Sequence, residues 1–438
     1  MARKLFGTDG VRGVAGEQVT AELALSLGRI AALRSKPSRP RVLVIRDTRE
    51  SGDMLEAAIA AGVAEAGGDV LLGGVVPTPA APLLLRRYAF DLAIVLSASH
   101  NPYRDNGIKV FGPDGFKLSD AEEVEIERNL ADEGARGGPI GRIRRLHGAA
   151  EDYMRELHVR FEHLDLSSLD VVLDCANGAT HRVGPEIFAR LGAKVRSLAV
   201  EPDGRNINEG CGSTHITALA EHVVSGGHDI GFAFDGDGDR VLAVDRAGVV
   251  VDGDELLALA AVHLRDVGRL PGGGVAVTVM TNYGFHTAMQ EAGIEVFTTA
   301  VGDRYVLEAL RERGWTLGGE QSGHVIDMGF APSGDGIATA LLTLEALAGR
   351  DLVDRSGMRK LPQQLVNVGV RDRGAFGMSE LVAAAVEREH QALHGRGRVL
   401  VRPSGTEPLV RVMVEAPTEL ETHEVCERLV ELVRAELS

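Results

Sequence analysis

The sequence predicts an α/β protein with three related α/β domains and a smaller α+β domain at its C-terminal end. Short apolar runs of strand length alternate with helical stretches, and this alternation repeats three times before residue 361. Each repeat ends in a loop rich in Ser, Asp, Glu or His. From residue 361 the pattern changes to short strands and helices of a different arrangement, which indicates a domain of another type.

Length and composition exclude several classes of protein. A chain of 438 residues is long enough for several domains and can bury its cores without disulfides. Its three cysteines, Cys175, Cys211 and Cys426, form no CxxC pair, which favours reduced thiols and disfavours a zinc site. No signal-peptide pattern and no stretch of membrane-spanning length is present, so we expect a cytoplasmic protein. The net charge of -16 disfavours binding to nucleic acid or to an anionic membrane.

A glycine-rich segment, residues 6–13, precedes the first repeat and surrounds Arg12 with three glycines. It either lets the backbone approach a ligand closely or forms only a hairpin with Thr8, Asp9 and Gly10 as its bend. The segment 133–145 indicates a linker or an edge hairpin. Between residues 13 and 133, the apolar pattern predicts helices at 20–33, 54–66 and 82–87 and strands at 42–45, 70–72 and 92–96.

The strand predicted at 92–96 ends in Ser97-Ala98-Ser99-His100-Asn101-Pro102. Ligands of open α/β sheets bind beyond the carboxyl ends of the strands, so a hydroxyl at this position is placed to meet a substrate. Ser, Asn and Pro are also the residues of ordinary turns, so this segment alone leaves both interpretations open.

The second repeat has predicted strands at 171–173, 194–198 and 230–234 and a helix at 216–224. Its last strand leads into Asp235-Gly236-Asp237-Gly238-Asp239-Arg240. In an extended segment the three carboxylates point to one side, and together they require a hard cation such as Mg²⁺. An EF-hand calcium loop is excluded, because Arg240 and Arg246 stand where that loop needs glycine and glutamate. The alternative is an acidic surface turn, which rarely follows so apolar a strand.

The third repeat has predicted strands at 275–280, 295–298 and 315–317 and a helix at 304–313. The loop 319–324 follows, and its carboxylate, hydroxyl and imidazole groups suit hydrogen bonds to the hydroxyls of a sugar. It does not match the G-x-S-x-G nucleophile elbow, since that motif needs a glycine where Glu320 stands.

The C-terminal domain has predicted strands at 365–370, 399–401 and 409–415 and helices at 378–389 and 420–436. Between two of these strands lies Arg402-Pro403-Ser404-Gly405-Thr406-Glu407, and Arg411 follows. Two hydroxyls, backbone N–H groups beside a glycine and two arginines suit the binding of a phosphate, although the segment taken alone fits a hairpin turn equally well.

The four loops together predict one kind of chemistry. Phosphoryl transfer to and from a serine on a sugar phosphate uses a nucleophile, a magnesium site, a polyhydroxyl-binding loop and a phosphate pocket. The chain has no Walker A sequence and no G-x-G-x-x-G after a strand, so nucleoside triphosphates and dinucleotides lose support as ligands.

At these motifs the chain resembles the α-D-phosphohexomutase superfamily over its whole length. FGTDGVRG, SASHNP, DGDGDR, GEQSGH and RPSGTEP occur in the expected order. The resemblance implies an α/β fold of four domains around a central cleft, three of them related α/β domains with mixed sheets and the last a smaller α+β domain. The domains expected are 1–148, 149–248, 249–360 and 361–438.

The resemblance also implies roles for single residues. Ser99 is expected to carry the phosphoryl group, and the metal ligands expected for Mg²⁺ are Ser99 with its phosphoryl group, Asp235, Asp237 and Asp239. The residues expected around the transferring phosphate are Arg12, Lys109 and Arg240, with His324 as a proton-transfer partner. The substrate-binding residues expected are Glu320 and Ser322 for the sugar hydroxyls and Arg402, Ser404, Gly405, Thr406 and Arg411 for the other phosphate.

Gln321 and the segment 302–304 resemble the branch of the superfamily that acts on glucosamine phosphates. The implied reaction moves a phosphoryl group reversibly between the 6- and 1-positions through a 1,6-bisphosphate, which also serves as activator, and supplies UDP-N-acetylglucosamine for cell-wall precursors. We expect a sugar phosphate as the partner and a monomer or homodimer. A glucose or mannose phosphate mutase stays open, as do a magnesium-dependent sugar-phosphate phosphatase and, least favoured, a non-catalytic sugar-phosphate sensor.

Overall fold

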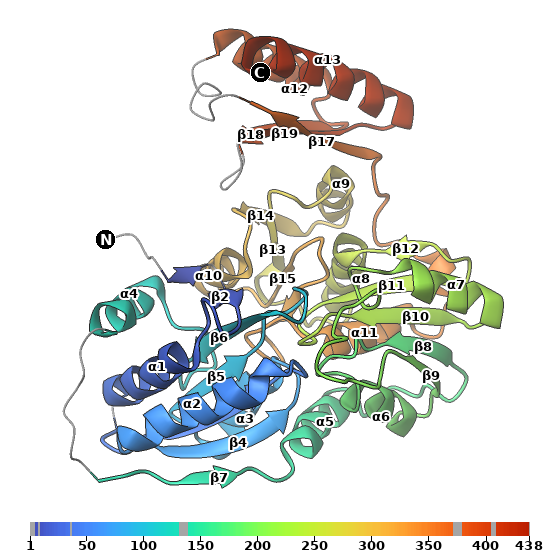
Figure 1. Ribbon diagram of the computed structural model, residues 1–438. Helices are drawn as coiled ribbons and strands as arrows, with labels where there is room; N and C mark the ends of the chain where they lie inside the picture. The colour runs from blue at the N-terminus through green and yellow to red at the C-terminus, as the bar shows by residue number, and fades with distance from the viewer. Residues whose placement is uncertain are drawn as a thin grey trace. The chain divides into compact units, whose positions relative to one another are not determined.

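The computed structural model describes residues 5–7, 9–35, 37–130, 139–370, 379–403 and 409–437. These residues belong to two compact units (Figure 1). The larger unit comprises Met1–Val279 and Glu295–Arg355, and the smaller one comprises Met280–Ile294 and Ser356–Ser438. Three sheets lie in the larger unit, and a three-stranded sheet lies in the smaller one.

The first sheet has seven strands and helices on both of its faces. Val42 and Val44 pack in a core with the helices α1 and α2, whereas the intervening Leu43 and Ile45 point to the opposite face. The strands are β1 Phe6–Gly7, β2 Gly10–Val14, β3 Arg41–Arg46, β4 Asp69–Val75, β5 Leu92–Leu96, β6 Asp105–Phe111 and β7 Ile143–Arg145, and the helices are α1 Ala21–Arg34, α2 Ser51–Glu65, α3 Ala80–Tyr88, α4 Asp120–Asn129 and α5 Ala149–Arg160.

Two predictions for this sheet are decided by the structure. Residues 6–7 and 10–13 form a hairpin, because β1 and β2 pair antiparallel; Gly10 of the predicted bend belongs to β2, and Thr8 lies outside the described residues. The interpretation of residues 133–145 as an edge hairpin is wrong for the described part, because β7 pairs parallel with β4 as a single edge strand. Residues 131–138 lie outside the described residues.

The second and third sheets have five and four strands. The second consists of β8 Asp170–Asp174, β9 Lys194–Leu198, β10 Ile230–Phe234, β11 Val241–Asp245 and β12 Val250–Val251, with α6 Val183–Arg190 and α7 Thr217–Gly226. The third consists of β13 Gly274–Thr278, β14 Glu295–Thr299, β15 Leu317–Gly319 and β16 Val325–Asp327, with α8 Gly253–Asp266, α10 Asp303–Arg313 and α11 Gly336–Leu347. Short 3-10 turns occur at Pro271–Gly273 and Leu352–Asp354.

The three sheets repeat one arrangement. The repeated strand orders are β6-β5-β3-β4, β11-β10-β8-β9 and β16-β15-β13-β14. In each, the last three strands are parallel and the first runs antiparallel beside the second. The prediction of three related α/β units with mixed sheets is therefore confirmed. In each unit, one loop joins the parallel strand that comes last along the chain (β5, β10 or β15) to the antiparallel strand that follows it. These three loops contain Ser99, Asp235 and Glu320.

The antiparallel strands and several helices were not predicted. β6 begins with Asp105, Asn106 and Gly107, and β16 is three residues long, so neither shows an apolar run. α11 is buried along almost its whole length and therefore lacks an amphipathic period. Two strands of the third repeat have other bounds than the predicted 275–280 and 315–317. The strand β13 ends at Thr278, and β15 begins at Leu317, two residues after the buried Trp315.

The smaller unit is an α+β fold, as predicted. Its antiparallel sheet has the order β17-β19-β18, with Gln363–Gly369, Leu409–Glu415 and Arg398–Pro403. The helices are α12 Glu380–Ala392, α13 Glu419–Leu437 and α9 Tyr283–Glu291. The helix α9 belongs to this unit because Asn282 donates to the Leu361 carbonyl and the Tyr283 backbone N–H donates to Glu415.

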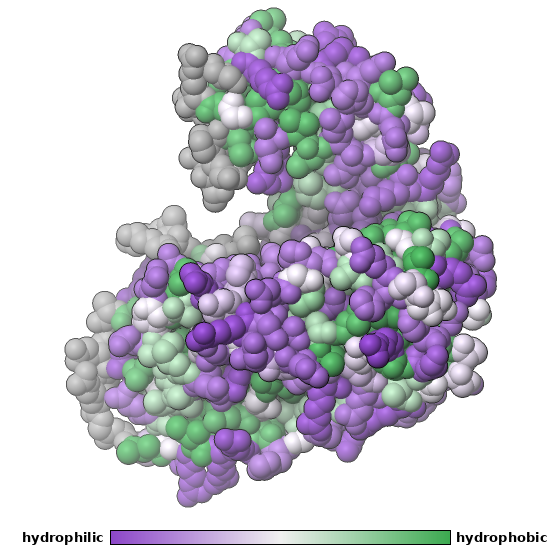
Figure 2. All heavy atoms as spheres, turned by 45° about the vertical axis from the view of Figure 1, so that its right-hand side comes forward, coloured by the Kyte–Doolittle hydropathy of each residue, from purple (hydrophilic) through white to green (hydrophobic). Residues whose placement is uncertain are grey.

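On the face that Figure 2 shows, hydrophilic and hydrophobic side chains are interspersed. Several of the large hydrophobic residues that are exposed lie far apart in the fold, for example Leu33 on α1 and Val159 on α5. Among the described helices, none combines the length and the apolar character that crossing a membrane requires.

One buried carboxylate of the fold predicts a pH dependence of stability. Asp335 caps α11 by accepting from the Ala338 N–H, and its two oxygens also accept the Tyr153 hydroxyl at 2.9 and 3.0 Å. Burial raises the pKa of Asp335 from 3.8 to about 7, although these hydrogen bonds favour the charged form. Between these two pH values the folded state therefore binds a proton that the unfolded state does not bind, so stability falls as the pH rises through this range.

As the pH rises through this range, the wild type should lose up to about 4 kcal/mol of its free energy of unfolding, since one pKa unit corresponds to about 1.4 kcal/mol. We expect Asp335→Asn to abolish this loss. The amide keeps an oxygen that can cap α11 and accept from Tyr153. Thermal unfolding midpoints of the variant and the wild type at pH 5 and pH 8 test this. The midpoint of the variant relative to that of the wild type should be higher at pH 8 than at pH 5. Equal differences at both pH values would contradict the prediction.

Candidate active site

The serine loop lies directly after β5, whose five residues are all buried. Ser99 is fully buried and has a φ of 53°, in the left-handed region that residues other than glycine rarely adopt. Such a conformation costs on the order of 1 kcal/mol and is typical of functional sites. The Ser99 hydroxyl donates to Asp235 Oδ2 at 2.5 Å, so the serine loop meets the loop that follows β10.

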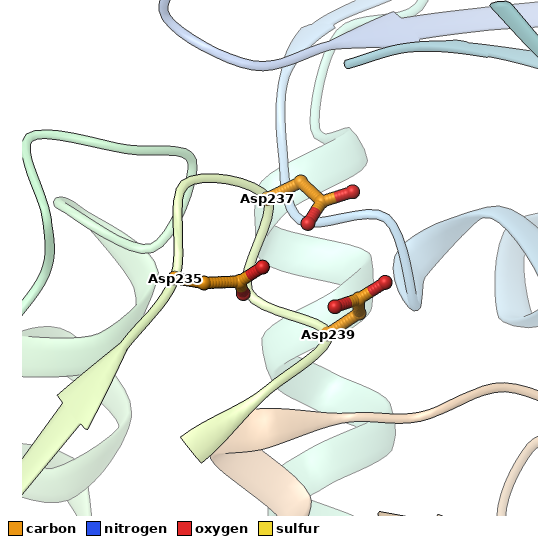
Figure 3. A group of neighbouring side chains, drawn as sticks. All are labelled: Asp235, Asp237 and Asp239. Atoms are coloured by element: carbon orange, nitrogen blue, oxygen red, sulfur yellow. The ribbon is translucent and has the colours of Figure 1, made fainter. Parts of the chain in front are cut away.

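The carboxylates of Asp235, Asp237 and Asp239 converge, as Figure 3 shows. All three are buried, and one ligand oxygen from each lies within 4.8 Å of the others. The prediction of an extended segment is wrong, because residues 236–239 form turns and Gly238 has a φ of 73°. The glycines make this turn possible, since a Cβ on Gly236 would lie 2.6 Å from the Ser99 carbonyl oxygen.

This group of oxygens fits a hard cation. Asp237 Oδ1 and Asp239 Oδ1 are buried and have no hydrogen-bond partner among the described residues. Buried carboxylate oxygens without a partner are costly, and a cation with oxygen ligands such as Mg²⁺ compensates that cost. The other oxygen of Asp237 accepts from Lys109 Nζ at 2.9 Å and from the Thr78 hydroxyl at 2.6 Å, which fixes the orientation of the carboxylate.

Burial and mutual repulsion perturb the charges of the triad. Burial and the carboxylates of Asp239 and Asp237 raise the pKa of Asp235 well above its usual range. Burial alone would also raise the pKa of Asp239, but His324 and Lys109 outweigh it and the pKa is lowered. The triad therefore holds its negative charge unevenly when only protein groups surround it.

Two cationic side chains lie beside the triad: Lys109 Nζ is 2.9 Å from Asp237 Oδ2, and Arg240 Nε is 3.8 Å from Asp239 Oδ1. Lys109 lies on β6, opposite Val95 of β5, and its ammonium group is buried. Burial lowers the pKa of Lys109, but the negative charges of Asp237 and Asp9 raise it by a larger amount. The pKa of Lys109 therefore lies above its usual value. Arg240 donates its backbone N–H to Asp235 Oδ1 at 3.2 Å.

Arg12, on β2, hydrogen-bonds to Asp9, and Asp9 also pairs with Lys109 at 3.0 Å. Asp9 additionally accepts from Lys117, whose ammonium group contacts Asp303 at 2.5 Å. These ion pairs link the glycine-rich N-terminal hairpin to the segment 302–304.

His324 connects the triad to the third sheet. Its Nδ1 lies 3.5 Å from Asp239 Oδ1, and its Nε2 lies 3.8 Å from Asp303 Oδ2. Burial lowers the pKa of His324, but the carboxylates of Asp239 and Asp303 outweigh it and raise the pKa. Glu320 is half-buried and accepts from the Gly302 N–H at 3.2 Å, whereas Ser322 is exposed.

The structure places the remaining predicted residues in the smaller unit. Arg402 and Arg411 are direct partners across β18 and β19, so their side chains lie on one face of the sheet. Arg402 also contacts Met280 Sδ at 3.7 Å. Ser404, Gly405 and Thr406 lie outside the described residues.

Several residues that contact this site were not predicted. Thr78 follows β4 at the same sheet edge as Ser99, so the rule that sites gather at carboxyl ends points to it. Asp9 lies within the glycine-rich segment 6–13 but was given no role in the site, and only the folded chain brings it to Lys117. Arg304, in contrast, pairs with Asp120 and Glu123 of α4.

Three repeated α/β sheets bring a buried serine, a carboxylate triad and clustered cations together. Models of the phosphoglucomutase/phosphomannomutase family match the chain in four parts. They are alpha/beta/alpha domain I at residues 3–136, alpha/beta/alpha domain II at 151–248, alpha/beta/alpha domain III at 252–365 and the C-terminal domain at 365–432. The chain belongs to this family.

Relatives and solved structures agree with this assignment. The chain is 49% identical to a phosphoglucosamine mutase of Pelotomaculum thermopropionicum, covering 98% of this chain and 99% of the relative. It is 51% identical to a phosphoglucosamine mutase of Moorella thermoacetica, with 96% and 97% covered.

Among solved structures, a phosphoglucomutase/phosphomannomutase family protein from Burkholderia thailandensis shares the fold with a TM-score of 0.83 and 24% identity, covering 99% of this chain and 97% of that one. An N-acetylphosphoglucosamine mutase of Aspergillus fumigatus, solved with GlcNAc-6P and magnesium, shares it with a TM-score of 0.71 and 17% identity, covering 99% and 96%.

Proposed function

We propose that this protein is an isomerase that interconverts glucosamine 6-phosphate and glucosamine 1-phosphate, with Ser99 as the residue that carries the phosphoryl group. The observation that carries the proposal is the hydrogen bond from the buried Ser99 hydroxyl to Asp235, within a triad whose free oxygens suit a cation. Relatives at about 50% identity named phosphoglucosamine mutase support the choice of amino sugar.

Asp235, Asp237 and Asp239 are proposed to hold Mg²⁺ together with the phosphoryl group on Ser99. When bound, the ion supplies positive charge against the oxygens of the transferring group. The triad is suited to this role because its donors are all oxygens and two of them lack a hydrogen-bond partner in the described part of the chain.

Lys109, Arg12 and Arg240 are proposed to surround the transferring phosphoryl group. Lys109 stays protonated because Asp237 and Asp9 face its ammonium group. His324 is proposed to accept or return the proton of the reacting sugar hydroxyl, since its ring lies between the triad and Asp303.

Substrate binding is divided between two loops. Glu320 and Ser322 are proposed to bind sugar hydroxyls, and the N–H of Gly302 supports Glu320 for this task. Arg402, Arg411 and the loop residues Ser404, Gly405 and Thr406 are proposed to bind the phosphate that is not transferred. Arg402 and Arg411 are direct partners on adjacent strands, so one face of the sheet offers two guanidinium groups to a phosphate.

The reaction proposed has two transfers. First, the P–O bond of phosphoserine 99 breaks and the phosphoryl group bonds to the free hydroxyl of the sugar monophosphate, which gives a 1,6-bisphosphate and returns Ser99 to a hydroxyl. The bisphosphate then turns within the site, and its other phosphoryl group transfers back to Ser99. A hexosamine or hexose 1,6-bisphosphate added in trace amount would keep Ser99 phosphorylated.

The domain boundaries 1–148, 149–248, 249–360 and 361–438, a cytoplasmic location and a monomeric or homodimeric state remain part of this proposal. The four family models support a division into four domains.

The test is kcat/KM for glucosamine 1-phosphate against glucose 1-phosphate, with magnesium and a trace of hexose 1,6-bisphosphate. Both the 6-phosphate product and free phosphate are followed. We expect a preference for the amino sugar of at least about 10-fold, which corresponds to about 1.4 kcal/mol, and no release of phosphate. An equal or reversed preference would indicate a glucose or mannose phosphate mutase. Continuous phosphate release would indicate a phosphatase, and removal of magnesium with a chelator should stop turnover reversibly.

A further inference from the structure

Arg49 is the most fully bonded side chain near the serine loop. It lies just after β3, is completely buried and has all five of its N–H groups paired. Nε donates to Asp47 Oδ2 at 2.9 Å. The other four N–H groups donate to backbone carbonyls of the serine loop and the residues after it, namely those of Ser99, Asn101, Pro102 and Asp105.

A second chain of hydrogen bonds reaches Ser99 from the same place. Asp47 accepts the Ser97 hydroxyl at 2.5 Å, and Ser97 Oγ in turn accepts the Ser99 backbone N–H at 2.9 Å. The backbone of Ser99 is therefore held at its N–H through Asp47 and at its carbonyl by Arg49. Asp47 and Arg49 also bond to each other, so the two supports act as one rigid group.

The second sheet contributes a further support. Asn208 donates to the Ser99 carbonyl at 2.9 Å and to the Asn101 carbonyl at 3.1 Å, so two of the carbonyls that Arg49 binds accept a second hydrogen bond. Peptide carbonyls turned inward in this way are satisfied only when donors of matching geometry are present. A planar guanidinium provides four such donors at fixed angles, and lysine does not.

We propose that Arg49 is a positioning residue for phosphoryl transfer, which holds Ser99 in its left-handed backbone conformation and aims its oxygen at the carboxylate triad. The inference rests on the proposed role of Ser99 as phosphoryl carrier. Arg49 itself does not reach the triad, because its N–H groups are all used by Asp47 and by the backbone. Its effect on turnover therefore passes through the geometry of the loop.

A residue that only stabilised the fold would lower stability without changing the chemistry of the folded enzyme. Arg355 offers a control, because it is a partly buried arginine that bonds to Glu255 at 2.8 Å and Asp245 at 3.0 Å, and none of its hydrogen bonds described here reaches the serine loop. Arg49→Lys and Arg355→Lys each replace a hydrogen-bonded guanidinium group by an ammonium group. Both should unfold at lower temperature than the wild type.

The experiment compares kcat, KM, the thermal midpoint and hydrogen exchange of peptide 97–106 in the wild type, Arg49→Lys and Arg355→Lys. We expect Arg49→Lys to lower kcat roughly 100-fold with KM changed by less than about threefold, because a displacement of about 1 Å at a reacting group has this effect. Exchange in peptide 97–106 should increase in this variant only. Arg355→Lys should keep the kcat of the wild type.

A folded Arg49→Lys enzyme with the kcat of the wild type would overturn the inference, and so would equal exchange of peptide 97–106 in both variants. If Arg49→Lys does not fold, Ser97→Ala decides, since it removes one hydroxyl between Asp47 and the Ser99 N–H. We expect it to lower kcat roughly 10-fold, and an unchanged kcat would overturn the inference. A wild type without mutase turnover would refute the proposed function, while the exchange measurement would still test Arg49.

Discussion

Ser99→Ala should abolish phosphoryl transfer and leave the fold intact. The hydroxyl is the group that would carry the phosphoryl, and loss of a nucleophile that forms a covalent intermediate costs more than about 10⁴-fold in kcat. Alanine removes one buried oxygen that bonds to Asp235 and leaves the backbone hydrogen bonds of Ser99 in place. Turnover of glucosamine 1-phosphate and the circular dichroism spectrum check the two halves of this prediction.

Mass spectrometry adds a direct measurement. After incubation with hexose 1,6-bisphosphate, the wild type should gain one phosphoryl group on the peptide that contains Ser99, and the variant should gain none. Ser225→Ala is the matched control, because the Ser225 hydroxyl bonds only within α7, to the Glu221 carbonyl. Full turnover in the Ser99→Ala enzyme would show that another residue carries the phosphoryl group.

The sequence was sufficient to predict the serine loop and the Asp loop because each directly follows a wholly apolar strand, β5 or β10. The five residues before the serine loop and the five before Asp235 are all buried. Both segments are continuous runs without polar residues, and this pattern predicted both strands. Two of the antiparallel strands were missed because β6 begins with polar residues and glycine and β16 has only three residues, whereas β11 has an apolar run, VLAV, that was overlooked. This omission left out the placement of Lys109, which β6 brings beside the triad.

The Asp loop shows that a correct prediction can rest on a wrong geometry. Alternation of Asp and Gly predicted convergence through an extended segment, whereas convergence comes from tight turns that need Gly236 and Gly238. A glycine at every second position is compatible with both conformations. Only the contact with the serine loop and with Thr180, against which a Cβ at these positions would clash, selects the turn.

The supporting residues could not be predicted, because their partners are remote in sequence. Arg49 lies 50 residues before Ser99, and Thr78 lies 159 residues before Asp237. An arginine at the end of a strand is normally an exposed residue, so no local pattern distinguishes Arg49 from Arg46, which is partly exposed and pairs with Asp53. Such positioning groups become visible only when the tertiary hydrogen bonds are known.

Asp237→Asn should weaken magnesium binding and turnover together. Asparagine keeps the shape of the side chain and an oxygen for the Thr78 hydroxyl, but it removes the charge that attracts a cation and that pairs with Lys109. We expect the dissociation constant for Mg²⁺ to rise more than about 10-fold and kcat to fall by at least the same factor. Calorimetric titration of the enzyme with Mg²⁺ alone measures the first effect without any dependence on catalysis.

Two control variants separate the charge from its surroundings. Asp165→Asn removes a charge from an exposed carboxylate that accepts from the backbone N–H and the side chain of Ser167, and it should leave the titration unchanged. Thr78→Val keeps the charge of Asp237 and removes one hydrogen bond, so the rise in the dissociation constant should be smaller than in Asp237→Asn. If Asp237→Asn and the wild type gave the same titration, the triad would not be the magnesium site. If Thr78→Val had the larger effect, orientation of the carboxylate rather than its charge would dominate binding.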